Sequence, residues 1–459
     1  MAEEYLHLGI TLYRTGKYQM EENKDFFFRP PGYPYFLHYA LKFYGGKNDL
    51  TKKFSSLEEM QRAFHALCAY LTRVQNILFS LTVLIFFGIA LQFHKQAVAF
   101  ILTLLFGCNP YFFILVGLIH YEILHIFLLS SGTFFLIREH HDKSLKLVWL
   151  ILSGTFFGLA TLVRPITLIL PLFAFIAFLL MERRKFLPSA IKTLILSLCM
   201  LIIVSPYSLR NYRLSQAFIP VNAQAGVALW SGTVKAMSIQ PNHYRWWDLW
   251  YTEGMPIYKK VAGEEELTAV SWARYNLLLE KEFKKEAYAN IKKQPLIYAH
   301  NVMINFISIN FCMNSVFIKI FEYIQLPGKQ FSKDMLKSNN HQTFQKDSLA
   351  NLFNLLVAYL TFCSIIGIYL GMRRNDLSIV PVAAIYLCVT IAHSITYMDV
   401  MYYYVKLPFL FMFFAYFLKH LTTRGKRAKD HMFMGAALVF PCFLTMILLF
   451  NLIFFNGGH

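Results

Sequence analysis

Four basic side chains lie at the ends of strongly apolar runs, where charged groups are costly and usually functional. Arg29 precedes the first run, Arg164 and Arg210 follow two later runs, and Lys406 lies near the start of another. Arginine forks hold phosphate oxygens through two parallel hydrogen bonds, and a low dielectric strengthens the pairing. Each residue alone is more typical of an interfacial cation whose stem lies in lipid. Together the four predict a phosphate site at one membrane boundary.

An acidic side chain accompanies these cations. Glu122 opens an apolar run and His125 follows three residues later, so the two share a helix face. That spacing can hold a metal, but the second ligand pair of an HExxH motif is missing. A carboxylate at the mouth of a cavity is better explained as a general base or an orienting group.

Arg29 also begins the sequence RPPGYP at 29–34. Its three prolines fix φ and remove three backbone donors, so the hexamer is predicted to be a rigid loop and not a helix. Such a loop preorganises the arginine for contact with an anion. The alternative is a loop that only turns the chain into the next helix.

The composition places the chain among the integral membrane proteins. Of its 459 residues, 56% are hydrophobic and 15% are charged, whereas soluble domains carry about 25% charge. The sequence therefore predicts an all-α polytopic bundle. Ten apolar runs approach the length needed to cross about 30 Å of hydrocarbon, at 76–93, 97–119, 122–137, 146–163, 165–181, 191–207, 351–371, 377–395, 404–420 and 432–455.

The net charge of +18 does not indicate nucleic-acid binding, because basic residues recur in alternate short loops between the runs. The positive-inside rule makes these loops cytoplasmic. Ten spans of this parity put both chain ends outside. The predicted regions are an outer juxtamembrane segment 1–75, a first bundle of about six spans 76–207, an outer aromatic-rich region 208–350 and four C-terminal spans 351–459.

Two features of the outer segments affect the interpretation. Five of the six tryptophans fall in 208–350, and the aromatic cluster at 244–251 predicts either an interfacial girdle or a platform that stacks against sugars. Residues 1–30 contain no signal peptide, so a chain that begins outside is expected to follow a first transmembrane helix that precedes Met1.

The ordered set of motifs resembles the GT-C glycosyltransferases that use polyprenyl-phosphate sugars, a group that includes protein O-mannosyltransferases and lipid A aminoarabinose transferases. The resemblance runs over nearly the whole chain and implies a transmembrane helix bundle with an extracytoplasmic active site. The matching pieces are Glu4-Tyr5 with Gly16, Arg29 to Pro34, Tyr121-Glu122, Gly158 to Pro165, Pro206 to Tyr212 with Gly226, and Tyr402-Tyr403-Tyr404 to Pro408.

One departure from the family concerns the catalytic acid. Members place an aspartate just after the first transmembrane helix, a few residues before the tyrosine that Tyr5 resembles. That position falls at about Met1, so either Glu3 or Glu4 substitutes, or the aspartate lies upstream, or the chain is inactive. The resemblance implies an inverting hexosyl or pentosyl transfer in which this carboxylate deprotonates the acceptor and Glu122 positions acceptor or sugar.

The resemblance also implies the partners of the site. These are a polyprenyl-phosphate sugar donor and a lipid, glycan or protein acceptor, at a bacterial inner membrane with the site facing the periplasm or exterior. Cationic side chains can neutralise the leaving phosphate, so no metal is required, although a divalent metal stays open. The candidate substrate-binding residues are Arg29, Tyr33, Arg164, Arg210, Asn211, Tyr403 and Lys406.

Two other interpretations remain. A flippase for lipid-linked saccharides would use many spans and phosphate-binding arginines too, but transporters commonly show internal pseudo-symmetry and charges near the bilayer midplane. Here the two halves of the chain do not match, and the notable charges lie at outer boundaries. An inactive relative of the enzymes is the other alternative.

Overall fold

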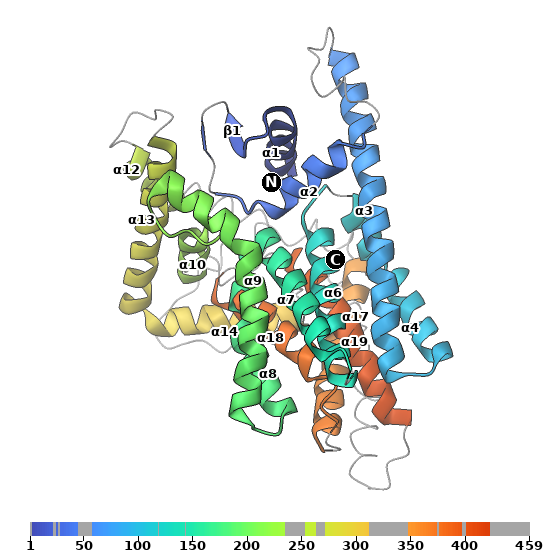
Figure 1. Ribbon diagram of the computed structural model, residues 1–459. Coiled ribbons are helices and arrows are strands. Elements are labelled where there is room, and N and C mark those ends of the chain that lie inside the picture. Colours follow the sequence, from blue (N-terminus) through green and yellow to red (C-terminus); the bar gives the residue numbers. More distant parts are fainter. Residues whose placement is uncertain are drawn as a thin grey trace, which may run out of the picture.

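The computed structural model describes residues 2–21, 24–25, 28–44, 57–117, 119–142, 144–234, 253–262, 271–311, 348–373, 376–396 and 401–422. Apart from one small hairpin, the described elements are helices (Figure 1). In chain order they are α1 (Ala2–Thr15), β1 (Gln19–Glu21), β2 (Lys24–Asp25), α2 (Gly32–Leu41), α3 (Leu57–Phe93), α4 (Gln96–Gly107), α5 (Pro110–Gly117), α6 (Glu122–His141), α7 (Lys146–Val163), the 3-10 helix η2 (Pro165–Ile169), α8 (Leu170–Met181), α9 (Phe186–Ser215), α10 (Ala225–Thr233), α12 (Met255–Ala262), α13 (Ser271–Lys293), α14 (Pro295–Phe311), α17 (Ser348–Arg373), α18 (Val380–Ile395) and α19 (Met401–Thr422).

The predicted class, an all-α polytopic membrane protein, is confirmed. Three described stretches are long and apolar enough to cross a membrane, namely Phe64–Phe93 within α3, α7 and α9. Shorter apolar helices accompany them, at Gln96–Gly107, Pro165–Met181, Tyr359–Gly371 and Val380–Ile395. The total of ten spans stays a prediction, and the run 432–455 lies outside the described residues.

The continuous span predicted at 97–119 is wrong. The chain forms α4 and α5 instead, separated at Cys108 and Asn109. Pro110 explains the break, because it lacks the N–H that would continue α4 and its fixed φ suits the first position of a new helix. By contrast, the first predicted span, 76–93, begins earlier in the chain, because α3 runs without a break from Leu57 to Phe93.

The prediction of a loop throughout 29–34 is also wrong. Pro31 caps α2, and the helix begins at Gly32, so Pro34 falls in the first turn. N–H groups of a first turn have no partner within the helix, and proline is therefore tolerated there. A Cβ on Gly32 would lie 2.7 Å from the carbonyl carbon of Leu162 and the backbone nitrogen of Val163. The start of α2 thus rests directly on the end of α7.

Small residues bring α7 close to α6 and α9. A Cβ on Gly154 would lie 2.8 Å from the carbonyl oxygen of Leu196 on α9. On the other side, Ser153 Oγ donates to the carbonyl of Gly132 on α6 at 2.9 Å. In lipid, such close packing and interhelical hydrogen bonds hold helices together, because the surrounding chains are as apolar as the helix surfaces.

Within the region 208–350, which the sequence predicts to lie outside, two asparagines tie α14 to the ends of other helices. Asn301 Nδ2 donates to Gly232 O at 3.1 Å, and Asn305 Nδ2 donates to Ser394 O at 3.1 Å. These carbonyls belong to the last turns of α10 and α18, where backbone acceptors lack helical partners. The aromatic cluster 244–251 lies outside the described residues.

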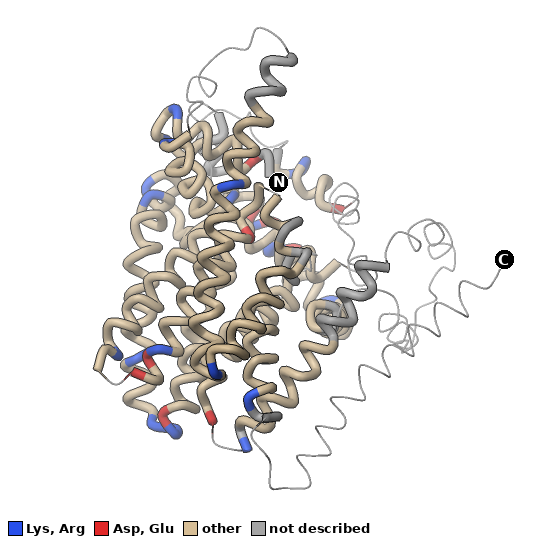
Figure 2. The backbone as a smooth tube through the Cα atoms, turned by 90° about the vertical axis from the view of Figure 1, so that its right-hand side faces the viewer, with Lys and Arg blue, Asp and Glu red and all other residues tan. Residues whose placement is uncertain are grey.

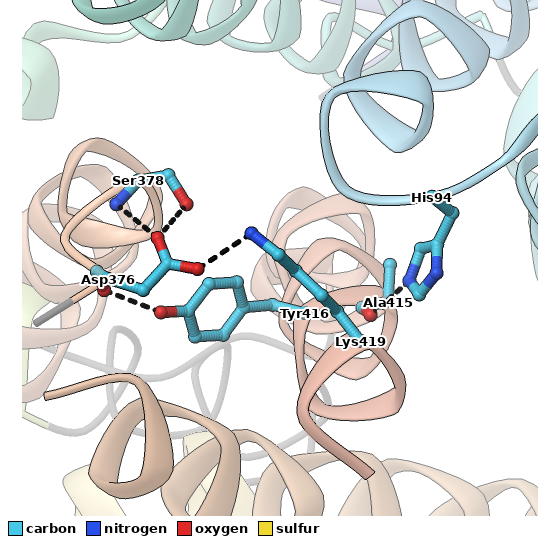
Figure 3. Close-up of polar contacts among 6 residues, drawn as sticks. All are labelled: His94, Asp376, Ser378, Ala415, Tyr416 and Lys419. Atoms are coloured by element: carbon cyan, nitrogen blue, oxygen red, sulfur yellow. Dashed lines mark hydrogen bonds and ion pairs between the residues drawn. The ribbon is translucent and has the colours of Figure 1, made fainter. Parts of the chain in front are cut away.

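Among the described residues, Lys, Arg, Asp and Glu lie mostly toward the two ends of the bundle and are sparse along its middle (Figure 2). At the end predicted to be cytoplasmic, Asp376 pairs with Lys419 of α19 at 2.7 Å, and Tyr416 donates to the carbonyl of Asp376 at 2.6 Å (Figure 3). His94, just after α3, contacts the carbonyl of Ala415. These bonds fasten α19 to the α17–α18 connection and to α3.

Candidate functional site

The first arginine of the site pairs with a carboxylate of α1. Arg29 Nε and Nη2 donate to Glu4 Oε2 at 2.9 and 2.5 Å. Arg29 lies in the short segment before α2, and Glu4 lies in the first turn of α1, where a carboxylate suits the positive helix end. The arginine side chain is 14% exposed and the glutamate 39%. This pair therefore lies at the surface of the site.

The second arginine pairs with a carboxylate of α6. Arg164 Nη1 donates to both carboxylate oxygens of Glu122 at 3.2 Å. Arg164 follows α7, immediately before Pro165, and Glu122 is the first residue of α6. His120 Nδ1 lies 4.0 Å from Glu122 Oε1. With the glutamate side chain fully buried and the arginine 8% exposed, this pair belongs to the interior.

Tyrosine rings lie between the two pairs. The Arg29 guanidinium is 5.9 Å from the Tyr5 ring centre, and the Arg164 guanidinium is 5.3 Å from that of Tyr121. The rings of Tyr5 and Tyr121 meet edge to face at 5.1 Å. Burial raises the pKa of Tyr5 above its ordinary value, although Arg29 and Arg164 lower it. At neutral pH the Tyr5 hydroxyl is therefore protonated, and it can donate a hydrogen bond but not act as a base.

Arg210 reaches the same region from α9. Its Nη2 donates to the carbonyl of Tyr18 at 2.8 Å, and its guanidinium lies 5.4 Å from the Tyr18 ring centre. Tyr18 in turn donates its hydroxyl to the carbonyl of Arg29 at 2.9 Å. The structure thus places Arg29 and Arg164 on either side of the Tyr5–Tyr121 ring pair and joins Arg210 to Arg29 through Tyr18. The shared anion site stays a prediction.

The other predicted residues have structural contacts. Tyr33 donates its hydroxyl to Gln75 Oε1 at 2.9 Å, and Asn211 Nδ2 donates to Ile219 O and Val221 O, both at 3.1 Å. Both predicted residues are buried. Glu3 and Tyr403 lie in the first turns of α1 and α19, and their side chains fall outside the described part of the chain.

Lys406 is fully buried within α19. Its Nζ donates to the carbonyl of Ile309 at 2.5 Å and to Asn310 Oδ1 at 3.2 Å, so it satisfies the C-terminal end of α14.

Comparison with known proteins bears on the central part of this site. Residues 64–209 match the family model described as dolichyl-phosphate-mannose-protein mannosyltransferase. The predicted GT-C resemblance is confirmed. The matched segment contains the Glu122–Arg164 pair and ends one residue before Arg210.

A solved GT-C structure also aligns with the chain. The archaeal oligosaccharyltransferase AglB from Archaeoglobus fulgidus, in complex with an inhibitory peptide and a dolichol-phosphate, shares 14% identity at a TM-score of 0.49. The alignment covers 97% of this chain and 51% of that one, so this chain spans about half the length of the archaeal protein. No curated protein matches the chain.

Sequence reasoning missed two residues that organise the site. Gln75 accepts a hydrogen bond from Tyr33 and donates to Val116 O at 2.8 Å, and Tyr18 joins Arg210 to Arg29. The signal for Gln75 was weak, because it lies just before the apolar run 76–93 and beside the polar Asn76. The sequence held no comparable signal for Tyr18, since tyrosine is abundant throughout the chain.

Within the described ranges, no group of three or more His, Cys, Asp or Glu side chains is placed to hold a metal ion. His125, which shares a helix face with Glu122, contacts Thr167 Oγ1 through Nε2 at 3.3 Å. Each carboxylate of the site is instead paired with an arginine.

Proposed function

We propose that this chain transfers a sugar from a polyprenyl-phosphate donor to an extracytoplasmic lipid, glycan or protein acceptor. The observation that carries the proposal is that Arg29 and Arg164 flank the ring pair of Tyr5 and Tyr121, each beside a carboxylate. Arg210 is joined to the backbone of Arg29 through Tyr18. Arginine side chains suit the charge that grows on a departing phosphate, and a nearby carboxylate suits proton removal.

Burial separates the roles of the two carboxylates. Glu4 is partly exposed and can meet an acceptor, so we assign it the role of general base. It would take a proton from an acceptor hydroxyl or amine as that group attacks the anomeric carbon from the face opposite the phosphate, which inverts the configuration. Glu122 is fully buried and holds Arg164 in place. We assign it a positioning role.

The arginines complete this mechanism. As the bond from the anomeric carbon to the phosphate oxygen breaks, the electron pair stays on the lipid phosphate, and Arg29 and Arg164 stabilise that charge without a metal. We place the reaction at the outer face of a bacterial inner membrane, because the loops at the opposite end of the bundle carry the lysine and arginine excess.

Transfer of radiolabelled sugar tests the proposal. The chain in native membranes is incubated with a panel of hexosyl and pentosyl undecaprenyl phosphates and an extract of acceptors, with Arg164→Ala as the matched variant. We expect one donor to label an acceptor with the wild-type chain and at least about a hundredfold less label with the variant. Movement of lipid-linked sugar across liposomes without product would instead support the flippase.

A further inference from the structure

We propose that the Glu4 carboxylate occupies the phosphate-binding fork of Arg29 until a lipid phosphate displaces it, so that donor binding releases the base. This inference rests on the proposed function and adds an order of events to it. In the resting protein the arginine and the glutamate bind each other. When a donor arrives, both become available for their separate tasks.

The geometry of the pair supports the exchange. Glu4 Oε2 accepts from Arg29 Nε and Nη2 together, which uses the edge of the guanidinium that a phosphate would take for two parallel hydrogen bonds. The carboxylate and a phosphate cannot both hold this edge. Within the described chain, Glu4 has no hydrogen bond or ion pair besides those to Arg29. Displacement of Glu4 by a phosphate therefore breaks only its contact with Arg29.

Burial confines the exchange to this pair. Glu4 is 39% exposed, so water can solvate the carboxylate once the phosphate has replaced it. Glu122 is fully buried against Arg164, and removing its partner would leave a desolvated charge without compensation. A donor phosphate can thus take over the fork of Arg29, whereas Arg164 keeps its glutamate and contributes a fixed positive charge.

The exchange predicts a sequence of steps that balances charge and protons. The donor phosphate binds Arg29 first and frees Glu4, whose carboxylate then accepts the acceptor proton as the new glycosidic bond forms. The lipid phosphate takes the electron pair of the broken bond and at first remains bound to Arg29. When the lipid phosphate dissociates, Glu4 loses its proton to water and binds Arg29 again. Before the donor arrives, the base is held away from the acceptor.

Binding of undecaprenyl phosphate tests the exchange without requiring turnover. Affinities are measured for wild type, Glu4→Gln and Arg29→Gln in lipid nanodiscs, with neutral undecaprenol as the reference ligand. Removing the competing carboxylate should tighten binding about twofold to fivefold, because water screens a partly exposed ion pair and leaves it weak. Arg29→Gln should weaken binding at least about tenfold. Glu282→Gln is the control. It removes a carboxylate paired with Lys260 at 3.2 Å and should leave the affinity for undecaprenyl phosphate unchanged.

Two results would overturn the inference in different ways. If wild type binds undecaprenyl phosphate and Glu4→Gln binds it equally or more weakly, the pair is only structural, while the proposed donor stands. If no form prefers undecaprenyl phosphate to undecaprenol, the donor and the exchange both fail.

A spectroscopic measurement on the wild-type sequence covers the case in which Glu4→Gln does not fold. The chain is labelled with ¹³C-glutamate, and infrared difference spectra are recorded on adding undecaprenyl phosphate. We expect one labelled carboxylate band to shift as Glu4 loses Arg29, and this band should be missing from Glu4→Asp, whose aspartate carries no label. An unshifted spectrum at saturating ligand would rule out the exchange.

Discussion

At the scale of single residues, the two arginine–carboxylate pairs differ in what holds them. A partly exposed ion pair such as Glu4–Arg29 is held weakly, near the value of about 0–1 kcal/mol that is typical of surface pairs, because water reaches its carboxylate. Breaking a buried pair such as Glu122–Arg164 costs about 3–5 kcal/mol, because the remaining charge stays desolvated. The first pair can therefore exchange partners during a reaction, and the second fixes the position of its arginine.

The buried pair leads to a prediction about Arg164. Arg164→Lys keeps the charge but loses the planar guanidinium, whose Nη1 meets both oxygens of Glu122 and which faces the Tyr121 ring. We expect sugar transfer to fall about a hundredfold while protein abundance changes less than about twofold. Arg138→Lys is the control, because Arg138 stacks on Trp149 at the opposite end of the bundle. Equal activity in the two variants would exclude Arg164 from the site.

At the scale of elements, α2 connects the parts of the site. Its first residue, Gly32, rests on the end of α7, which carries Arg164, and the next residue, Tyr33, is tied to α3 through Gln75. The Tyr33 ring also meets that of Tyr5 at 5.8 Å. A shift of α2 would therefore move the aromatic cluster relative to both arginines.

Gly32→Ala tests this connection. The added Cβ would meet backbone atoms at 2.7 Å, so α2 must move away from α7. We expect transfer to fall at least about tenfold, because displacement of about 1 Å is costly in a site that depends on positioning, with a loss of about 1–3 kcal/mol in stability. Gly117→Ala is the matched control, since its Cβ would meet nothing within 4 Å. Transfer rates and melting temperatures that match those of the control would contradict this role for α2.

At the scale of the whole molecule, α9 connects the two ends of the helix bundle and so relates the membrane face of one end to that of the other. Its 30 residues correspond to about 45 Å at 1.5 Å per residue, enough to cross the bilayer. The basic connection just before α9 is predicted to be cytoplasmic, whereas Arg210 near its far end joins the tyrosine cluster. The phosphate site and the Asp376–Lys419 contact would then lie at opposite ends of the bundle.

Cysteine labelling tests this orientation. The seven native cysteines are first replaced. Phe218→Cys then places one thiol at an exposed position just beyond the C-terminal end of α9, and Leu187→Cys places one at an exposed position near its N-terminal end. A membrane-impermeant maleimide should label Phe218→Cys in intact spheroplasts and Leu187→Cys only after permeabilisation. The reverse pattern would put the arginine site in the cytoplasm.

The sequence by itself determined the class of the protein and most of its helices, because runs of apolar residues long enough for a bilayer are local signals. It also singled out Arg164 and Arg210, since a charge beside such a run stands out, and Arg29, which begins the RPPGYP motif. It misjudged 97–119 and 29–34, where proline position within a helix decides between a break and a first turn.

Only the tertiary structure decided which groups meet. Glu4 and Arg29 are 25 residues apart, and Glu122 and Arg164 are 42 apart. Whether such a pair is exposed or buried depends on how helices pack around it, and no local pattern records that. The same packing ties Lys406 to the end of α14. The exposed pair and the buried pair look alike in sequence, and burial alone separates an exchangeable contact from a fixed one.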